Sequence, residues 1–186
     1  MSRSPNIINT NELTQTQVSK LTQEGIALHQ QGNFSEAQVI YEQILMGKPD
    51  HFDALQLLGV LFAQVKKYSQ SVEFLSKALE INPNHAGAFS NRGIALKELK
   101  QFDEALASYD QAIAVKPDYL DAYSNRGNLL MELSRFDEAL ASYDQAIKIN
   151  PDYAESYGYR GITLKKLNRF DEALASYDQA IKINPD

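Results

Sequence analysis

The chain has 186 residues, of which 44% are hydrophobic and 23% charged, and its formal net charge is −6. These proportions are those of a folded chain rather than a disordered one. The acidic balance argues against general binding to nucleic acid or anionic lipid, since both need dense lysine and arginine. The absence of cysteine excludes disulfides, thiolate nucleophiles and cysteine-bound zinc.

The first residues lack any periodic pattern. Residues 1–11 are rich in asparagine, serine and threonine, so we expect a flexible tail, with a helix beginning near Asn11 or Glu12. They contain no apolar core of a signal peptide, and the longest apolar stretch, 54–65, is too short to span a membrane. We therefore expect a cytoplasmic protein that does not bind membranes.

From residue 12 onward the chain repeats itself. The eighteen residues 169–186 also occur at 135–152, and twelve of them occur again at 102–113. A glycine recurs every 34 residues: Gly25, Gly59, Gly93, Gly127 and Gly161. A proline follows each glycine by 24 residues: Pro49, Pro83, Pro117, Pro151 and Pro185. The sequence therefore predicts one domain, 12–186, made of the repeats 18–51, 52–85, 86–119, 120–153 and 154–186.

Each repeat has the pattern of two helices. In the fourth, the apolar stripe has a 3.6-residue period and is formed by Ala122, Tyr123, Leu129, Leu130 and Leu133. The closing proline ends the second helix, because the residue before a proline avoids the α conformation. Helices of about 13 residues joined by turns of three or four must pack antiparallel. The predicted fold is all-α, with five antiparallel helix pairs.

The helix starts carry candidate caps. Asp137 is the predicted N-cap of a second helix, and the same position is held by Ser35, Ser69, Asp103 and Asp171. Asp118 and Asp152 are the predicted N-caps of first helices, with Asp121 and Glu155 completing capping boxes.

The mid-helix glycine needs its own explanation, because glycine there costs about 1 kcal/mol relative to alanine. Its recurrence predicts a close approach of two helices. The expected partners are the small residues twelve positions later: Ala37, Ser71, Ala105, Ala139 and Ala173.

The period, the glycine, the small positions, the aromatic residue before the second helix and the closing proline together resemble the tetratricopeptide repeat (TPR) family. The resemblance covers roughly residues 18–186. It implies a right-handed superhelix, an α-solenoid, whose first helices line a concave groove. It also implies a scaffold for protein–protein interaction that binds a protein or peptide partner.

No arrangement of residues in the sequence points to catalysis. The three histidines, His29, His51 and His85, are far apart in a solenoid, and no zinc-protease, phosphate-loop or serine-hydrolase motif occurs. Pairs of acids such as Asp137 and Glu138 stand at helix starts, where the helix dipole favours them. We expect no enzyme activity, no cofactor and no metal.

The resemblance places certain positions of each first helix in the groove. The predicted peptide-binding residues are Asn91, Lys97, Asn125, Asn128, Glu132, Tyr159 and Lys165. Asn91 and Asn125 occupy the same position in successive repeats, which resembles the asparagine ladder of O-linked N-acetylglucosamine transferase arms. Side-chain amides both donate and accept, so such a ladder can hold an extended peptide. Two asparagines left by repeat duplication and facing water remain the alternative.

Two other binding modes could apply to this sequence. The family's carboxylate clamp needs basic residues at the fifth position of each repeat, where this sequence has none, and only Asn128 fits the ninth. Arg92, Arg126 and Arg160 form a regular row that could receive an acidic partner. The favoured interpretation of this row is structural: the arginine stems cover apolar surface and pair with acids of neighbouring helices such as Asp110, Asp144 or Asp178.

The last repeat lacks a polar terminal cap, which solenoids usually need. One hypothesis is that these residues are the amino-terminal, acceptor-recruiting arm of a larger glycosyltransferase-like enzyme, since the first two repeats resemble bacterial arms of that kind. A second is a stand-alone adaptor. A third is a homo-oligomer that forms through the exposed face of the last helix, with Leu174, Tyr177 and Ile181 in the contact.

Overall fold

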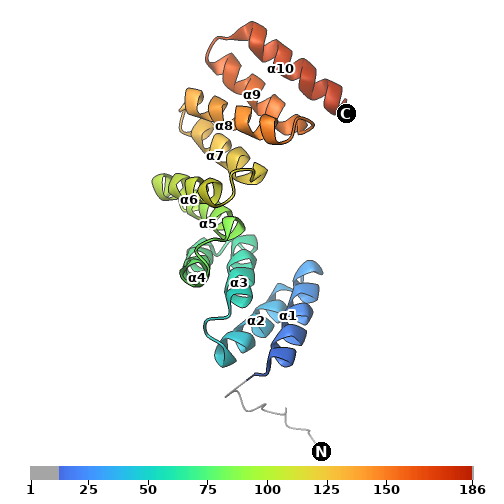
Figure 1. Ribbon diagram of the computed structural model, residues 1–186, viewed down its shortest axis with the longest axis vertical. Helices are drawn as coiled ribbons and strands as arrows, with labels where there is room; N and C mark the ends of the chain where they lie inside the picture. The colour runs from blue at the N-terminus through green and yellow to red at the C-terminus, as the bar shows by residue number, and fades with distance from the viewer. Residues whose placement is uncertain (1–12, 186) are drawn as a thin grey trace, which may run out of the picture. The chain divides into compact units, whose positions relative to one another are not determined.

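The computed structural model describes residues 13–185, and within that range it contains ten α-helices and no strand (Figure 1). The chain forms two compact units that meet in sequence between Pro83 and Asn84. The predicted all-α fold of paired helices is therefore confirmed. None of the helices in the described range is long and apolar enough to cross a membrane.

Unit 1, up to Pro83, holds two helix pairs, in which α1 packs on α2, α3 packs on α4, and α2 packs on α3. Its helices are α1 (Gln15–Gln30), α2 (Phe34–Gly47), α3 (Phe52–Gln64) and α4 (Tyr68–Ile81). The side chain of Thr14 accepts a hydrogen bond from the backbone of Gln17, whose side chain bonds back, so a capping box starts α1. The expected start near Asn11 or Glu12 and the predicted tail 1–11 lie outside the described residues.

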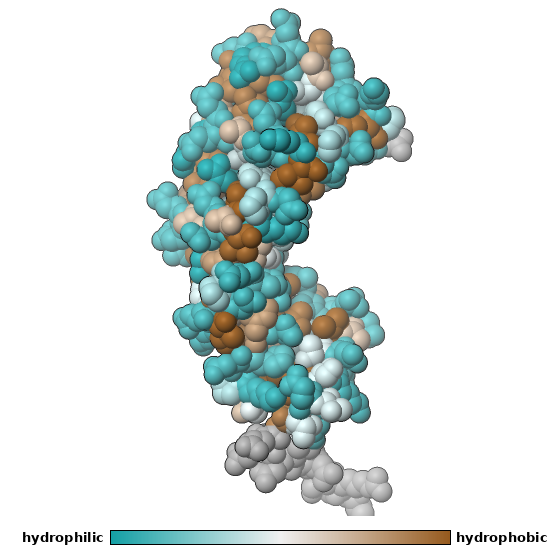
Figure 2. All heavy atoms as spheres, viewed as in Figure 1, coloured by the Kyte–Doolittle hydropathy of each residue, from teal (hydrophilic) through white to brown (hydrophobic). Residues whose placement is uncertain are grey.

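Unit 2, from Asn84 onward, holds three further pairs in the same succession. Its helices are α5 (Ala86–Glu98), α6 (Phe102–Val115), α7 (Leu120–Glu132), α8 (Phe136–Ile149), α9 (Ala154–Lys166) and α10 (Phe170–Ile183). The odd-numbered first helices also touch one another, α5 against α7 and α7 against α9. On the face shown in Figure 2, hydrophobic residues form separate patches among hydrophilic ones rather than one continuous band.

The turn inside each helix pair is a Schellman motif. After α7, Ser134 adopts a positive φ of 59°, its N–H donates to Met131 and the N–H of Arg135 donates to Leu130. The same left-handed position is held by Gly32, Lys66, Lys100 and Asn168. This motif ends the first helix and, with no spacer, starts the second.

The predicted caps of the second helices are wrong for that reason. The Schellman turn makes Arg135 the N-cap of α8 and Phe136 its first residue, so Asp137 already lies inside the helix. The other second helices start in the same register, one residue before the predicted positions Ser35, Ser69, Asp103 and Asp171, and none has a side-chain cap. The carboxylates in these first turns still complement the helix dipole.

The predicted caps of the first helices are also wrong. Tyr119 and Tyr153 are the N-caps of α7 and α9, and neither helix has a side-chain cap, so Asp118 and Asp152 do not cap and no capping box forms with Asp121 and Glu155. Side-chain caps are present at two other first helices, α3 and α5, where histidines provide them. The Nδ1 atoms of His51 and His85 accept from the backbone N–H of Ala54 at 3.2 Å and of Ala88 at 3.0 Å.

The mid-helix glycines allow a close approach, as predicted, but the partner differs. A Cβ added to Gly127 would lie 2.7 Å from Cε1 of Tyr143, and one added to Gly161 would lie 2.6 Å from Cε1 of Tyr177. Tyr41, Leu75 and Tyr109 press on Gly25, Gly59 and Gly93 in the same way. The residue that contacts each glycine is thus sixteen positions later, not twelve, because a large side chain uses the space that the missing Cβ leaves.

Candidate functional site

A polar hollow of about 300 Å³ lies along the first helices of unit 2. Three successive repeats contribute to its wall, from α5, from α7 with its N-cap, and from α9 with its N-cap. The lining residues are Ser90, Asn91, Ile94, Tyr119, Asp121, Ser124, Asn125, Asn128, Tyr153, Glu155, Ser156 and Tyr159. Because the three helices are related by the 34-residue repeat, equivalent positions line up from one helix to the next.

The structure brings together four of the seven predicted groove residues: Asn91, Asn125, Asn128 and Tyr159 all line this hollow. Lys97, Glu132 and Lys165 do not, because they lie in the last turn of their helices, away from the N-cap ends that contribute to the wall. Lys97 lies 3.8 Å from Glu98 instead. Four of the predicted groove residues thus line the hollow, and the other three lie at the C-terminal ends of the same helices.

The lining asparagines differ in which side-chain polar atoms are free to bind a ligand. Oδ1 of Asn128 accepts a hydrogen bond from the buried hydroxyl of Tyr143 at 2.7 Å, which leaves its amide NH₂ as a donor. The amide nitrogen of Asn125 reaches Ser90 Oγ only at 3.5 Å, a weak contact. The side-chain amide of Asn91 has no hydrogen-bond partner within the described residues. The amides are therefore available to a ligand.

Two hydroxyl groups in the wall have no partner. Oγ of Ser124 and Oγ of Ser156 are buried and form no hydrogen bond within the part of the chain that the structure describes, and Ser156 is only 1% exposed. A buried hydroxyl without a partner costs about 1–3 kcal/mol. A hydrogen bond to either group, which a rotation of its side chain toward the hollow would permit, would recover that free energy.

One end of the wall combines tyrosines with acids. The Tyr153 hydroxyl donates to Glu155 Oε2 at 2.5 Å, and this bond, helped by burial and by the negative charges of Glu155 and Asp121, raises the pKa of Tyr153 to about 12. Burial and the charge of Asp121 also raise the pKa of Tyr119. The ring of Tyr159 is stacked on Tyr143, with centroids 5.8 Å apart and planes at 15°.

Sequence reasoning found this aromatic and acidic end only in part, since the family geometry places Asp121 and Tyr159 in the groove but not Tyr119, Tyr153 or Glu155. Tyr119 and Tyr153 stand just before the first helices, and an acid follows each by two residues, so the pattern Tyr-x-acid occurs in two successive repeats. That repetition was the available signal. A capping box is the role that the sequence suggests for Glu155, and it suggests none for Tyr119 and Tyr153.

Unit 1 has a separate hollow of about 590 Å³ with a different lining. His29 lines it, with Nε2 2.7 Å from Gln64 Oε1 and Nδ1 3.4 Å from the Tyr41 hydroxyl. Phe34 packs edge-on against the His29 ring, with centroids 5.6 Å apart. The polar atoms of the imidazole are thus taken up by neighbours, which makes the remaining wall mainly apolar.

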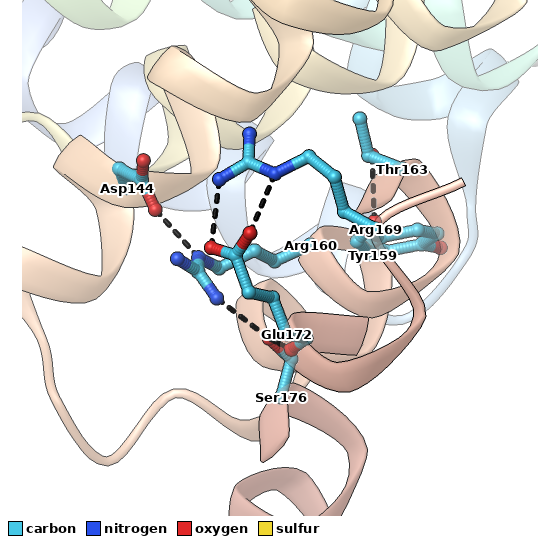
Figure 3. Close-up of polar contacts among 7 residues, drawn as sticks. All are labelled: Asp144, Tyr159, Arg160, Thr163, Arg169, Glu172 and Ser176. Atoms are coloured by element: carbon cyan, nitrogen blue, oxygen red, sulfur yellow. Dashed lines mark hydrogen bonds and ion pairs between the residues drawn. The ribbon is translucent and has the colours of Figure 1, made fainter. Parts of the chain in front are cut away.

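The arginine row has the structural role that the sequence favoured. Arg160 of α9 donates to Asp144 of α8 at 2.6 Å and to Ser176 of α10 at 2.7 Å, so one guanidinium joins three helices (Figure 3). Arg126 repeats this arrangement one repeat earlier, donating to Asp110 at 2.7 Å and to Ser142 at 2.8 Å.

Arg92 departs from this pattern. Its Nε donates to Ser108 Oγ at 3.2 Å, and its guanidinium lies over the Phe89 ring, 5.3 Å from the centroid. Each of the three arginines thus makes contacts within unit 2, and for Arg126 and Arg160 these include an aspartate.

The last helix exposes apolar side chains. Leu174 and Ile181 of α10 are 61% and 60% exposed, and Phe170 at its start is 60% exposed. Tyr177, the third residue predicted to take part in self-association, is half-buried because its ring lies on Gly161. Two of the three predicted residues are thus on an open apolar face, and the third belongs mainly to the α9–α10 pair.

Among the described residues, no group of three or more histidine, aspartate or glutamate side chains could hold a metal ion. The hollow in unit 2 offers amides, hydroxyls, carboxylates and aromatic rings. These groups can donate and accept hydrogen bonds to a polar ligand.

Comparisons with known proteins agree with this geometry. Similar solved structures include MamA, at 24% identity and a TM-score of 0.82 over 87% of this chain and 94% of that one. YrrB, described as a TPR protein with an unusual peptide-binding site, matches at 22% identity and a TM-score of 0.74 over 89% of this chain and 86% of that one. PilF of Pseudomonas aeruginosa matches at 22% identity and a TM-score of 0.80, over 90% of this chain and 76% of that one. At these identities the likeness concerns the fold alone.

A comparison with curated proteins finds no match. Family models do match. Those of the tetratricopeptide repeat cover residues 28–91, 120–153 and 154–186, and one of the TPR repeat covers residues 95–134. Together they take in most of the chain, which therefore belongs to the tetratricopeptide repeat family, a fold typical of protein-interaction scaffolds.

Proposed function

We propose that this chain binds an extended peptide segment of a partner protein along the first helices of unit 2. The observation that carries the proposal is the polar wall built by three successive repeats, in which hydrogen-bonding groups are left without partners. Asn91 and the NH₂ group of Asn128 are free, and the hydroxyls of Ser124 and Ser156 are buried and unpaired. Such groups match the alternating N–H and C=O groups of an extended backbone.

The repeat geometry supports a peptide rather than a compact ligand. Asn91 and Asn125 occupy one position in consecutive repeats, so the wall offers the same amide twice, one repeat apart, and Tyr159 holds the equivalent position in the third repeat. A small molecule would have no use for that regularity, whereas an extended chain has a regular repeat of its own. YrrB, a structural neighbour with the same fold, is described as having a peptide-binding site.

The test selects linear peptides from a phage-displayed random library against the full chain, and measures their affinity for variants. In the Asn91→Ala/Asn125→Ala double variant we expect affinity to fall about thirtyfold, because each of the two lost hydrogen bonds contributes about 1 kcal/mol. The matched control is Gln111→Ala/Gln145→Ala, which removes two exposed amides from second helices outside the hollow. Peptides that bind both variants equally well would place the site elsewhere.

A second candidate function, self-association through α10, has its own observation. The apolar face with Leu174 and Ile181 is open, whereas the same position in α8, Leu140, is 7% exposed. We propose that two copies of the chain pair through this face. The test measures mass against concentration for the native chain and for Leu174→Glu/Ile181→Glu, with Tyr177 left intact because it packs on Gly161. A native chain that stays monomeric at all concentrations would contradict this candidate.

A further inference from the structure

The hollow in unit 2 is unequally charged, and this points to one kind of side chain in its ligand. Asp121 and Glu155 are the charged residues in its wall, and no lysine, arginine or histidine lines it within the described residues. Asp121 forms no hydrogen bond or ion pair there, and Glu155 accepts one bond, from the Tyr153 hydroxyl. The wall therefore has two carboxylates with acceptor capacity to spare.

The two acids outweigh the helix ends beside them. Each lies in the first turn of α7 or α9, where the helix dipole contributes roughly half a positive charge. A full negative charge beside each half charge leaves the region negative. Burial and then the charge of Asp121 raise the pKa of Tyr119, and the hydrogen bond to Glu155, burial and the two carboxylate charges raise that of Tyr153.

The rest of this end of the wall fits a cation as well. Tyr119, Tyr153 and Tyr159 present aromatic rings, whose faces attract ammonium and guanidinium groups. Lys116 Nζ lies 5.3 Å from the centroid of the Tyr119 ring, although Lys116 does not line the hollow.

The unpaired hydroxyls of the wall would add further acceptors if their side chains turned toward a ligand. Ser156 is 1% exposed and lines the hollow next to Glu155, yet its Oγ has no partner within the described residues, and the same is true of Ser124 Oγ. A hydroxyl oxygen can accept a hydrogen bond from an N–H group of a guanidinium or ammonium, although that bond is weaker than one to a carboxylate. A volume of about 300 Å³ is at the lower limit of ligand sites, which suits one side chain.

From these contacts we propose that the hollow selects peptides that carry a lysine or arginine, whose cationic head lies between Asp121 and Glu155 against the three tyrosines. The proposal rests on the peptide-binding function above and adds its specificity. Carboxylates, aromatic faces and hydroxyl oxygens then have a common partner, and the asparagines hold the peptide backbone on either side.

The test uses four synthetic peptides, acetylated and amidated at their ends, that share a neutral glycine–serine–alanine sequence. They differ in one central residue, which is Arg, Lys, Gln or Glu. Each is titrated into the ¹⁵N-labelled full chain, and the amide shifts of the hollow are followed by NMR. We expect Arg and Lys peptides to bind about fivefold more tightly than the Gln peptide, the factor that one or two exposed charge contacts supply, with the Glu peptide weakest.

Two double variants give the matched comparison. Asp121→Asn/Glu155→Gln should abolish the preference for Arg and Lys over Gln, while Asp103→Asn/Asp137→Asn, with the same change in net charge on exposed positions of α6 and α8, should retain it. The preference should also weaken in high salt. All four substituted positions are exposed, so circular dichroism should show an unchanged fold.

The other outcomes are decisive too. Equal binding of all four peptides at the hollow, or tighter binding of the Glu peptide, would overturn the basic specificity and leave peptide binding standing. Equal loss in both double variants would show a general charge effect and overturn the inference. If no peptide shifts the hollow, both the inference and the peptide-binding proposal fail.

Discussion

Helices α8 and α10 have the same fourteen residues, FDEALASYDQAIKI, in different surroundings. In α8, which α9 covers, Leu140 is 7% exposed and Tyr143 is fully buried. In α10 the equivalent Leu174 is 61% exposed and Tyr177 half-buried. Both helices nevertheless begin and end at equivalent residues and have the same type of N-cap. Local sequence thus sets the helix, whereas the neighbouring repeat decides what each side chain contributes to stability.

The largest difference is expected at the equivalent leucines. Leu140→Ala should lower the free energy of unfolding of unit 2 by about 3 kcal/mol, because it leaves a cavity in a packed interface. Leu174→Ala should change it by less than about 0.5 kcal/mol, since the side chain is mostly in water. Urea unfolding followed by circular dichroism measures both. Similar losses in the two variants would mean that the face of α10 is covered in solution.

The next difference concerns the glycines. Gly127→Ala forces a Cβ against the Tyr143 ring, which is enclosed and cannot move, so we expect a net loss of about 1–2 kcal/mol after the gain in helix propensity. Gly161→Ala meets Tyr177, which can turn toward solvent, and should be close to neutral. Thermal unfolding of the two variants checks the order. A larger loss at Gly161 would contradict it.

The arginine clips, by which we mean the hydrogen bonds that Arg126 and Arg160 donate to the helices before and after them, should contribute equally to stability in the two repeats. Arg126→Gln and Arg160→Gln each remove one bond to an aspartate of the preceding helix and one to a serine of the following helix. The arginine side chains are 23% and 25% exposed and their aspartates about half exposed, so we expect a loss of about 1 kcal/mol in each case. Urea titrations of the pair measure it. A difference above about 1 kcal/mol would show that the two clips are not equivalent.

The smallest effect lies in the exposed pairs at the helix starts. Arg135 donates two hydrogen bonds to Glu138, both at 2.7 Å, and Arg169 does the same to Glu172. These bonds lower the pKa of both carboxyls, so their contribution to stability is present above the pKa of the unfolded chain and is lost as pH falls through the lower folded pKa.

Arg135→Gln and Arg169→Gln should therefore raise the pKa of the partner glutamate by equal amounts, measured by NMR titration of the side-chain carboxyl carbons. In each variant, the glutamate whose arginine partner is unchanged is the internal control. Unequal shifts would show that the surroundings of α10 reach even these local contacts.

Much of the fold could be predicted because the repeat multiplies each signal. Five equally spaced glycines and prolines fix the helix pairs far better than one of each would. The helix starts could not be predicted in the same way. Asp137 and Ser35 have side chains that often cap, but the Schellman turn before them uses a left-handed residue that is Ser, Lys, Asn or Gly in different repeats, so its sequence signal is weak.

The site was predicted in part for a related reason. Asn91 and Asn125 recur at one position and so were visible as a ladder. The tyrosines at 119 and 153 lie between helices, where helical periodicity says nothing about which way a side chain faces. Which hydroxyls are left unpaired, as in Ser156, depends on all the neighbours at once, and no local pattern encodes it.

The arginine clip has a consequence for how this chain can change over generations. Asp110, Arg126 and Ser142 form the same joint as Asp144, Arg160 and Ser176, shifted by one repeat. If residues 120–153 were duplicated in place, the copied arginine would meet Asp144 of α8, and the copied aspartate would meet Arg160. Every new joint would be of a kind the chain already contains. The gene could therefore gain or lose 34 codons in one recombination event and still encode a folded protein, with a longer or shorter recognition surface for selection to act on.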